Sequence, residues 1–183
     1  MSKQILFIQG GGDGGYKVDS ELVTSLQSAL GEQYAICYPE IKSNESMSDF
    51  GWTSQIGKNL SEAEDNLILI GHSFGALMIL KFLSENMVNK KLRGIFLIAT
   101  PFWSGNEDWQ VSLKLKDNFA DNLPDKVSIF FYHCKDDKEV PFSHLDVYKQ
   151  KLNQATFPEI ESGGHQLNND LTLVANDIKS LKF

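Results

Sequence analysis

The sequence predicts an α/β fold in which a mostly parallel sheet lies between two layers of helices. Two observations support this: short apolar runs recur along the chain, and stretches with helical spacing separate them. Continuous apolar runs of this length are typical of strands buried on both faces, as in a parallel sheet. The predicted strands are residues 4–8, 34–38, 66–70, 94–99 and 127–133, with a weaker sixth strand at residues 157–161.

The stretches between these runs have apolar residues at helical spacing. In the first, Leu22, Leu26 and Leu30 repeat every four residues, and we expect Asp19 or Ser20 to cap the helix. Residues 76–83 are nearly all apolar and predict a buried helix. Two further helices are predicted from two later stripes, Phe142, Leu145, Tyr148 and Leu152, and Leu171, Val174, Ile178 and Leu181.

Length and composition limit the possible functions. A chain of 183 residues without repeats or a Pro/Ser-rich linker fits one domain, residues 1–183. Its formal net charge of -7 argues against nucleic-acid or anionic-membrane partners. With four histidines and two cysteines we expect no metal site and no cofactor. The apolar run that follows residues 1–3 is too short for a signal peptide or a membrane span, so we expect a cytoplasmic protein. In that compartment the two cysteines should stay reduced.

A glycine cluster follows the first predicted strand. Gly10, Gly12 and Gly15 match the G-x-G-x-x-G pattern of dinucleotide-binding proteins, and Glu40 follows the second strand, where a ribose-binding carboxylate could lie. However, residues 16–18 separate the third glycine from the expected helix cap, which would turn the helix N-terminus away from a pyrophosphate. Dinucleotide binding is therefore kept only as a less favoured alternative.

The segment Gly71-His72-Ser73-Phe74-Gly75 lies between an apolar strand and an apolar helix. This is the G-x-S-x-G pattern in the context that a nucleophile elbow requires. The sharp turn strains the serine backbone, and its neighbours two residues away crowd each other and must be very small, hence the two glycines. Ser73 is thus the predicted nucleophile, exposed at the carboxyl edge of the sheet.

A serine nucleophile needs a base, and the base needs an acid to orient it. In the strand-to-helix elbow fold these residues follow the serine in the order acid, then histidine. The loop after the strand at residues 127–133 contains three carboxylates close to Pro141. We favour Asp137 as the acid, with Asp136 as the first alternative and Glu139 as the second.

Four histidines compete as the base. His72 lies beside the serine and should point away from it, His133 lies in a strand, and His144 lies in the helix that follows the acid loop. His165 follows Gly163 and Gly164 in a loop between the last strand and the last helix, and it completes the triad in the right order. His165 is therefore the predicted base.

With these motifs the chain resembles the α/β-hydrolases over nearly its whole length, and it is similar to the small serine hydrolases grouped with retinoblastoma-binding protein 9. The resemblance implies a minimal three-layer α/β-hydrolase-type sandwich without a large cap domain, and a triad of Ser73, Asp137 and His165. It also implies an oxyanion hole formed by the amides of Phe74 and Gly11. The retinoblastoma-binding motif Leu-x-Cys-x-Glu is absent, so that partner is not expected.

The resulting hypothesis is an esterase-like serine hydrolase that cleaves a small ester or related acyl substrate through an acyl-enzyme. Residues 104–123 are too short for a cap domain but long enough for a short lid. A non-catalytic binding or regulatory protein on a hydrolase fold is the main alternative, and the oligomeric state stays open. The candidate pocket residues are Gly10, Gly12, Phe102, Trp103 and Trp109.

Overall fold

Six parallel strands form one sheet in the computed structural model, which describes residues 3–182. The strand order is β2-β1-β3-β4-β5-β6. The strands are β1 (Lys3–Ile8), β2 (Tyr34–Cys37), β3 (Leu67–His72), β4 (Leu92–Ile98), β5 (Ser128–Cys134) and β6 (Glu159–Ile160). The helices are α1 (Gly15–Leu30), α2 (Trp52–Glu62), α3 (Ser73–Glu85), α4 (Ser143–Lys151) and α5 (Thr172–Ser180), with short 3-10 turns η1 (Asp108–Gln110), η2 (Phe119–Asn122) and η3 (Leu167–Asn169). The predicted fold class is confirmed.

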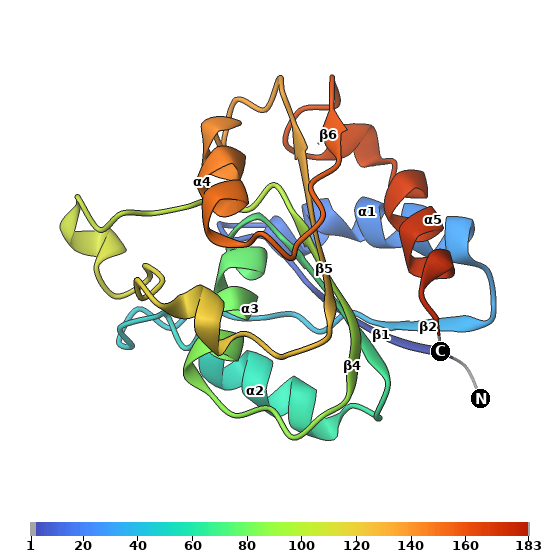
Figure 1. Ribbon diagram of the computed structural model, residues 1–183, viewed down its shortest axis with the longest axis horizontal. Helices are drawn as coiled ribbons and strands as arrows, with labels where there is room; N and C mark the ends of the chain where they lie inside the picture. Colours follow the sequence, from blue (N-terminus) through green and yellow to red (C-terminus); the bar gives the residue numbers. More distant parts are fainter. Residues whose placement is uncertain (1–2, 183) are drawn as a thin grey trace.

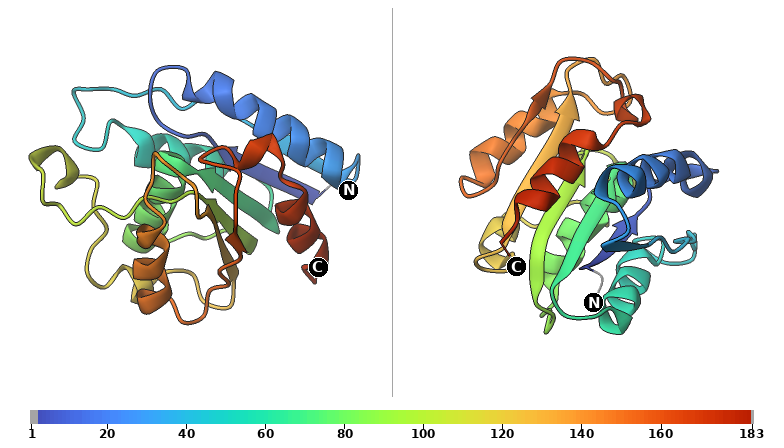
Figure 2. Two further views of the ribbon diagram at one scale, coloured as in Figure 1. Left: turned by 90° about the horizontal axis from the view of Figure 1, so that it is seen from above. Right: turned by 90° about the vertical axis from the view of Figure 1, so that its right-hand side faces the viewer.

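Both faces of the sheet are buried, which explains why its strands are continuously apolar. Along β1, Ile5 and Phe7 pack against α1 and α5, whereas Leu6 and Ile8 pack on the opposite face against α2 and α3. This alternation follows from the two-residue period of a strand. Figures 1 and 2 show the resulting layers, with α2, α3 and α4 on one side of the sheet and α1 and α5 on the other.

The first helix begins earlier than the sequence predicts. It starts at Gly15, so neither Asp19 nor Ser20 caps it, and Asp19 lies inside the helix with its side chain buried. The prediction was wrong because Asp19 has long-range partners, described below, instead of the backbone amides that a cap would bind.

The helix α2 was not predicted, although the sequence contains a signal for it. Trp52, Ile56 and Leu60 recur every four residues, and all three are buried against the sheet. The segment 104–123 that we considered as a lid contains only the turns η1 and η2. Four of its side chains are buried beside α3 and anchor it: Leu113, Leu115, Phe119 and Leu123.

The parallel arrangement brings the carboxyl ends of all strands to one edge of the sheet, where ligands bind in open α/β folds. The glycine cluster follows β1, Ser73 follows β3, and the acid loop follows β5. The predicted site segments therefore meet at this edge. Within residues 3–182, no helix combines the length and the apolar character that a membrane span requires.

Ser73 lies at the sharp junction of β3 and α3. Its φ is 50°, in the left-handed region that a non-glycine residue adopts only under strain. A Cβ on Gly71 would lie 2.7 Å from the Cα of Ala76, and one on Gly75 would lie 2.0 Å from the carbonyl oxygen of Gln9. Both glycines are thus required, but because of the helix and β1, not because they crowd each other.

We predict that Gly75→Ala destabilises the fold by about 3 kcal/mol or more, since the added methyl group overlaps the rigid backbone at the end of β1. Gly14→Ala is the matched control. Its φ is 87°, in the left-handed region that Gly75 does not occupy, but no atom lies within 4 Å of the added Cβ. We expect a loss of about 1 kcal/mol for this change, from backbone strain alone. Urea denaturation of the two variants measures the difference, and equal losses would contradict the role given to Gly75.

Candidate active site

His165 and Asp137 form a close pair at the carboxyl edge of the sheet. The Nδ1 atom of His165 lies 2.9 Å from Oδ2 of Asp137, and the Asp137 side chain is fully buried. The other carboxylate oxygen of Asp137 accepts the backbone N–H groups of Glu139 and Val140. The loop after β5 therefore holds the carboxylate from one side and the imidazole meets it from the other.

This environment shifts the pKa of both partners. Burial alone would raise the pKa of Asp137, but hydrogen bonds from His133, His165 and Val140 hold it well below its ordinary value. Burial alone would lower the pKa of His165, but the hydrogen bond and charge of Asp137 raise it, with further help from Glu139 and Asp19. Asp137 is therefore ionised at neutral pH and favours the protonated form of His165.

The neighbouring carboxylate, Asp136, has a different role. Its oxygens accept the backbone N–H groups of Gly163 and Gly164, at distances of 2.8 to 3.2 Å. These two bonds lower the pKa of Asp136. Asp136 thus anchors the loop that carries His165, while Asp137 contacts the imidazole itself.

The other two later histidines are occupied elsewhere. His133 is buried in β5, where its Nε2 donates to the carbonyl of Val140 and also lies 3.4 Å from Asp137. His144 in α4 accepts the backbone N–H of Phe102 through Nδ1. Neither lines a cavity with Ser73, whereas His165 does.

Two hollows meet at Ser73. A cavity of about 200 Å³ is lined by Ser73 and His165 together with Gly10, Gly11 and Glu139, among others. A second cavity, of about 410 Å³, contains Ser73, Phe74, Gly11 and Gly12. The half-buried Ser73 therefore lines both the cavity that His165 lines and the larger one.

The larger cavity, which we call the aromatic pocket, lies between the loop after β2, at residues 43–50, and the loop after β4, at residues 103–113. Its remaining lining residues are Ser43, Glu45, Phe50, Trp103, Trp109 and Leu113. Ser112 donates a hydrogen bond to the backbone oxygen of Ser48, which joins the two loops; they lie at the left of Figure 1. The sequence missed Phe50 and Glu45 because no local motif marks them.

Phe102 does not belong to this pocket. Its partly buried ring meets that of Tyr148 edge-on, with the ring centroids 5.4 Å apart, whereas Trp103 and Trp109 line the aromatic pocket together with Ser73. Gly10 lines the smaller cavity with His165. Of the five predicted pocket residues, Phe102 is thus the one that the structure places elsewhere, because its side chain completes the packing of α4.

Gly11 and Phe74, the two predicted oxyanion residues, line the same cavity. Phe74 is in the first turn of α3, where N–H groups have no partner within the helix. Neither amide donates a hydrogen bond within the part of the chain that the structure describes. A Cβ on Gly11 would lie 3.0 Å from the Cβ of Phe74, so the two segments are in close contact.

The side chain of Gln9 fixes the start of the glycine cluster. It is buried and forms two hydrogen bonds with Ile41, one to the backbone oxygen and one from the backbone N–H. The loop after β1 is thereby attached to the segment that follows β2. Gln9 therefore has a structural role at the base of the site.

The spacing argument against dinucleotide binding was wrong, because α1 begins at Gly15, the third glycine of the pattern. A different observation opposes a phosphate at this position. The carboxylate of Asp19 lies on the helix side of the loop and accepts the N–H of Gly10 at 2.6 Å. An anion would meet this negative charge and find that amide occupied.

The comparisons with known proteins agree with this geometry. The serine hydrolase family model matches residues 24–172, which include Ser73, Asp137 and His165. This chain belongs to the serine hydrolase family. The more specific similarity to the group of retinoblastoma-binding protein 9 stays a prediction.

Among curated proteins, this serine hydrolase is similar to the putative hydrolase YdeN of Bacillus subtilis, at 29% identity over 126 residues. The match covers 65% of this chain and 63% of YdeN, so the alignment spans less than two thirds of that relative. The structure of the ydeN gene product is 21% identical, has a TM-score of 0.65, and is matched over 98% of both chains.

More distant structures show the same fold. A meta-cleavage product hydrolase from Pseudomonas fluorescens IP01 has a TM-score of 0.75 at 15% identity, covering 97% of this chain and 91% of that one. Est1E from Butyrivibrio proteoclasticus with bound ferulic acid has a TM-score of 0.72 at 15% identity, covering 97% and 86%. These matches establish the α/β-hydrolase fold.

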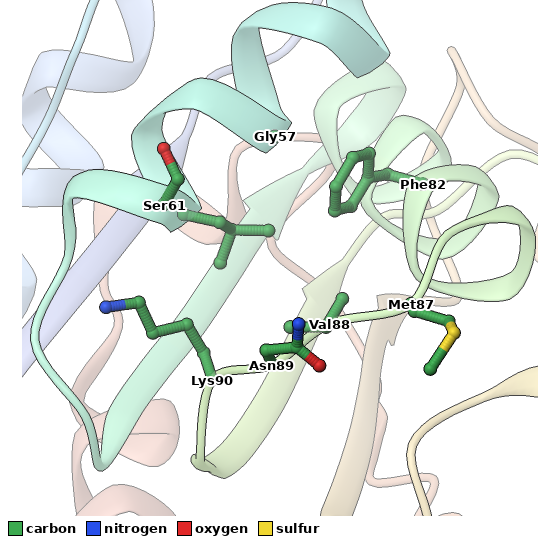
Figure 3. A pocket seen from close by; sticks show the side chains of 8 residues that line it. Gly57, Ser61, Phe82, Met87, Val88, Asn89 and Lys90 are labelled. Atoms are coloured by element: carbon green, nitrogen blue, oxygen red, sulfur yellow. The ribbon is translucent and has the colours of Figure 1, made fainter.

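Another cavity of this serine hydrolase, of about 340 Å³, lies away from Ser73. It is formed by α2, the end of α3 and the loop leading to β4 (Figure 3). Phe82 lines one wall, and Ser61 and Lys90 lie on the other side. No histidine or carboxylate is among the residues that line it, so it lacks the groups for acid–base chemistry.

We predict that His165 in this serine hydrolase titrates above 6.5 and that Glu139→Gln lowers its pKa. Oε2 of Glu139 lies 3.7 Å from Nε2 of His165, and removing this negative charge disfavours the imidazolium. Because the Glu139 side chain is 72% exposed, the change should shrink as salt is added. NMR titration of the imidazole resonances measures both effects.

The control for this titration is Glu64→Gln, an exposed carboxylate at the opposite edge of the sheet. It should leave the pKa of His165 unchanged. A wild-type His165 that titrates at or below 6.5 would contradict the prediction.

Proposed function

We propose that the protein is an esterase-like enzyme that hydrolyses small, uncharged esters through an acyl-serine at Ser73. One observation carries the proposal: His165, whose imidazole is held by Asp137, lines the same cavity as a serine in the strained elbow conformation. An acid-oriented imidazole beside an exposed serine is the arrangement that activates a hydroxyl nucleophile.

In the proposed first step, Oγ of Ser73 attacks the ester carbonyl carbon and Nε2 of His165 takes the hydroxyl proton. Asp137 keeps Nδ1 protonated and stabilises the imidazolium that forms. The imidazolium then donates its proton to the departing alcohol oxygen as the ester C–O bond breaks. Because only neutral His165 accepts the proton, the raised pKa of His165 predicts a rate that falls on the acidic side of neutrality.

The oxyanion would be held by the N–H groups of Gly11 and Phe74. Both amides lack partners in the described chain, and Gly11 allows its backbone close to Phe74. One oxyanion donor contributes about 3 kcal/mol to lowering the barrier. In the second step a water molecule gives a proton to His165 and attacks the acyl-serine, which releases the carboxylic acid and regenerates Ser73.

The aromatic pocket is the proposed site for the acyl group. Its volume of about 410 Å³ is at the small end of ligand pockets, and Phe50, Phe74 and Trp103 give it an apolar wall. The structural relative Est1E was crystallised with ferulic acid, which has an aromatic ring. We therefore propose short-chain or small aromatic acyl groups as substrates.

The test is labelling with a fluorophosphonate probe. We predict covalent labelling of Ser73, its loss in Ser73→Ala and His165→Ala, and a decrease in kcat of roughly a millionfold for Ser73→Ala with p-nitrophenyl butyrate. Circular dichroism and thermal unfolding confirm that both variants fold. A folded wild-type protein that neither reacts nor hydrolyses esters would instead support a binding or regulatory protein on this fold.

We also predict discrimination against negatively charged acyl groups. Apart from His72 and His165, the ionisable residues that line the two cavities at Ser73 are all acidic: Asp13, Asp19, Glu45 and Glu139. The kcat/KM for p-nitrophenyl hemisuccinate should therefore be about tenfold or more below that for the butyrate, and the gap should narrow at high salt.

Glu45→Gln removes the carboxylate of the aromatic pocket and should raise kcat/KM for the hemisuccinate while leaving that for the butyrate unchanged. Glu64→Gln again serves as the control. Equal kcat/KM values for the two esters in the wild-type protein would refute this charge preference.

A further inference from the structure

A second acid–histidine pair lies directly beside the proposed triad. Nδ1 of His72 is 2.9 Å from Oδ2 of Asp19, and each side chain is 1% exposed. Asp19 comes from α1 and His72 from the end of β3, next to Ser73. The chemistry proposed above uses neither residue, so this buried ionisable pair requires its own explanation.

Asp19 connects two segments of the site. Its Oδ2, already bonded to His72, also accepts the N–H of Gly10 at 2.6 Å, and its Oδ1 accepts the side-chain amide of Gln166 at 3.2 Å. Gly10 directly precedes the proposed oxyanion residue Gly11, and Gln166 directly follows His165. One carboxylate therefore restrains both the glycine loop and the histidine loop.

His72 adds a third connection. Its Nε2 lies 3.0 Å from the backbone oxygen of His165, and the two imidazole rings are 4.8 Å apart. A carbonyl oxygen can only accept, so Nε2 must carry a hydrogen. Nδ1 faces the carboxylate oxygen Oδ2 of Asp19, so both ring nitrogens of His72 have a partner.

The carboxylate is well suited to this arrangement. Burial alone would raise the pKa of Asp19, but hydrogen bonds and charge from His72, with bonds from Gly10 and Gln166, lower it. The N–H of Gly10 and Nδ1 of His72 both meet Oδ2 of the ionised Asp19. Through its other ring nitrogen, His72 also binds the backbone oxygen of His165. There is little free space, because a Cβ on Gly10 would lie 3.1 Å from Nδ1 of His72.

We propose that Asp19 and His72 are positioning residues, which hold the backbone of His165 and the glycine loop at the correct distance from Ser73. This inference rests on the proposed function. Asp137 orients the His165 imidazole through Nδ1, while His72 fixes the main chain that carries it. Such a pair acts on the geometry of the reacting groups, so its loss should affect kcat more than KM.

The experiment compares Asp19→Ala, His72→Phe and the double variant, with p-nitrophenyl butyrate as substrate. We expect kcat to fall about 10- to 100-fold in each single variant, with KM within about twofold of wild type. The double variant should lose clearly less than the two single losses multiplied together, because both single changes break the same bond between Asp19 and His72. The rate of fluorophosphonate labelling at Ser73 should fall in parallel.

Two further variants separate positioning from folding. Asp19→Asn keeps an oxygen for Gly10, and its amide can donate to Oε1 of Gln166 once the Gln166 side-chain amide turns over, because Nε2 is the atom that faces residue 19 and Oε1 has no partner in the described chain. It should therefore retain more of kcat than Asp19→Ala. Ser25→Ala is the control on the same helix: it removes a hydrogen bond from the backbone of Leu171 that does not involve the site, and kcat should not change.

The inference is overturned if the folded variants keep kcat within about twofold of wild type, or if the loss appears only in KM. Additive losses in the double variant would also overturn it. If Asp19→Ala does not fold, His72→Phe and Asp19→Asn decide the question by the same criteria. A wild-type protein that is inert toward the probe refutes the proposed function and this inference together, whereas a reactive wild type with equally reactive variants refutes this inference alone.

Discussion

The whole site depends on the backbone turn at Ser73. A residue with φ near 50° joins the central strand β3 to α3, and this turn is possible only because glycines stand on both sides of it. The backbone at the end of β1 leaves no room for a side chain at Gly75, so the position of the glycine cluster relative to the elbow is fixed by contact. The turn at Ser73 therefore fixes the position of the serine relative to both proposed oxyanion amides.

His165 is held by three residues, each of which binds a different part of the histidine or its loop. Asp136 binds two backbone amides of the histidine loop, and Asp137 binds the imidazole. His72 then holds the carbonyl of His165 from the interior. A loop with two glycines would otherwise be free to move, and these three anchors restrict it at the backbone and at the side chain.

Local patterns predicted what depends on local structure. The five main strands and the elbow were found because strand periodicity and the G-x-S-x-G motif act within a few residues. The start of α1 was not, because Asp19 looks like a helix cap but finds its partner 53 residues away in His72. The amphipathic helix α2 is not among the predicted helices, although its apolar residues Trp52, Ile56 and Leu60 recur with a helical period.

Within the site, the sequence predicts which segments take part but does not settle the roles of neighbouring residues in one loop. Sequence order narrowed the acid to one loop, but only the fold distinguishes Asp137, which meets His165, from Asp136, which meets the loop backbone. Likewise Phe102 and Trp103 are adjacent and both pack against the core, yet only Trp103 lines the aromatic pocket. Side-chain direction in an irregular loop follows from tertiary packing, which no local pattern encodes.

The hydrogen bonds around Asp19 have a consequence for how the protein folds. The bond from Gln166 to Asp19 joins residues 147 positions apart, and the bond between His72 and His165 joins residues 93 positions apart. Contacts of such long range close large loops of chain and are entropically costly to form early. The reactivity proposed for Ser73 would thus be a property of the completed tertiary structure, and labelling of this one hydroxyl would report whether the first and last thirds of the chain have come together.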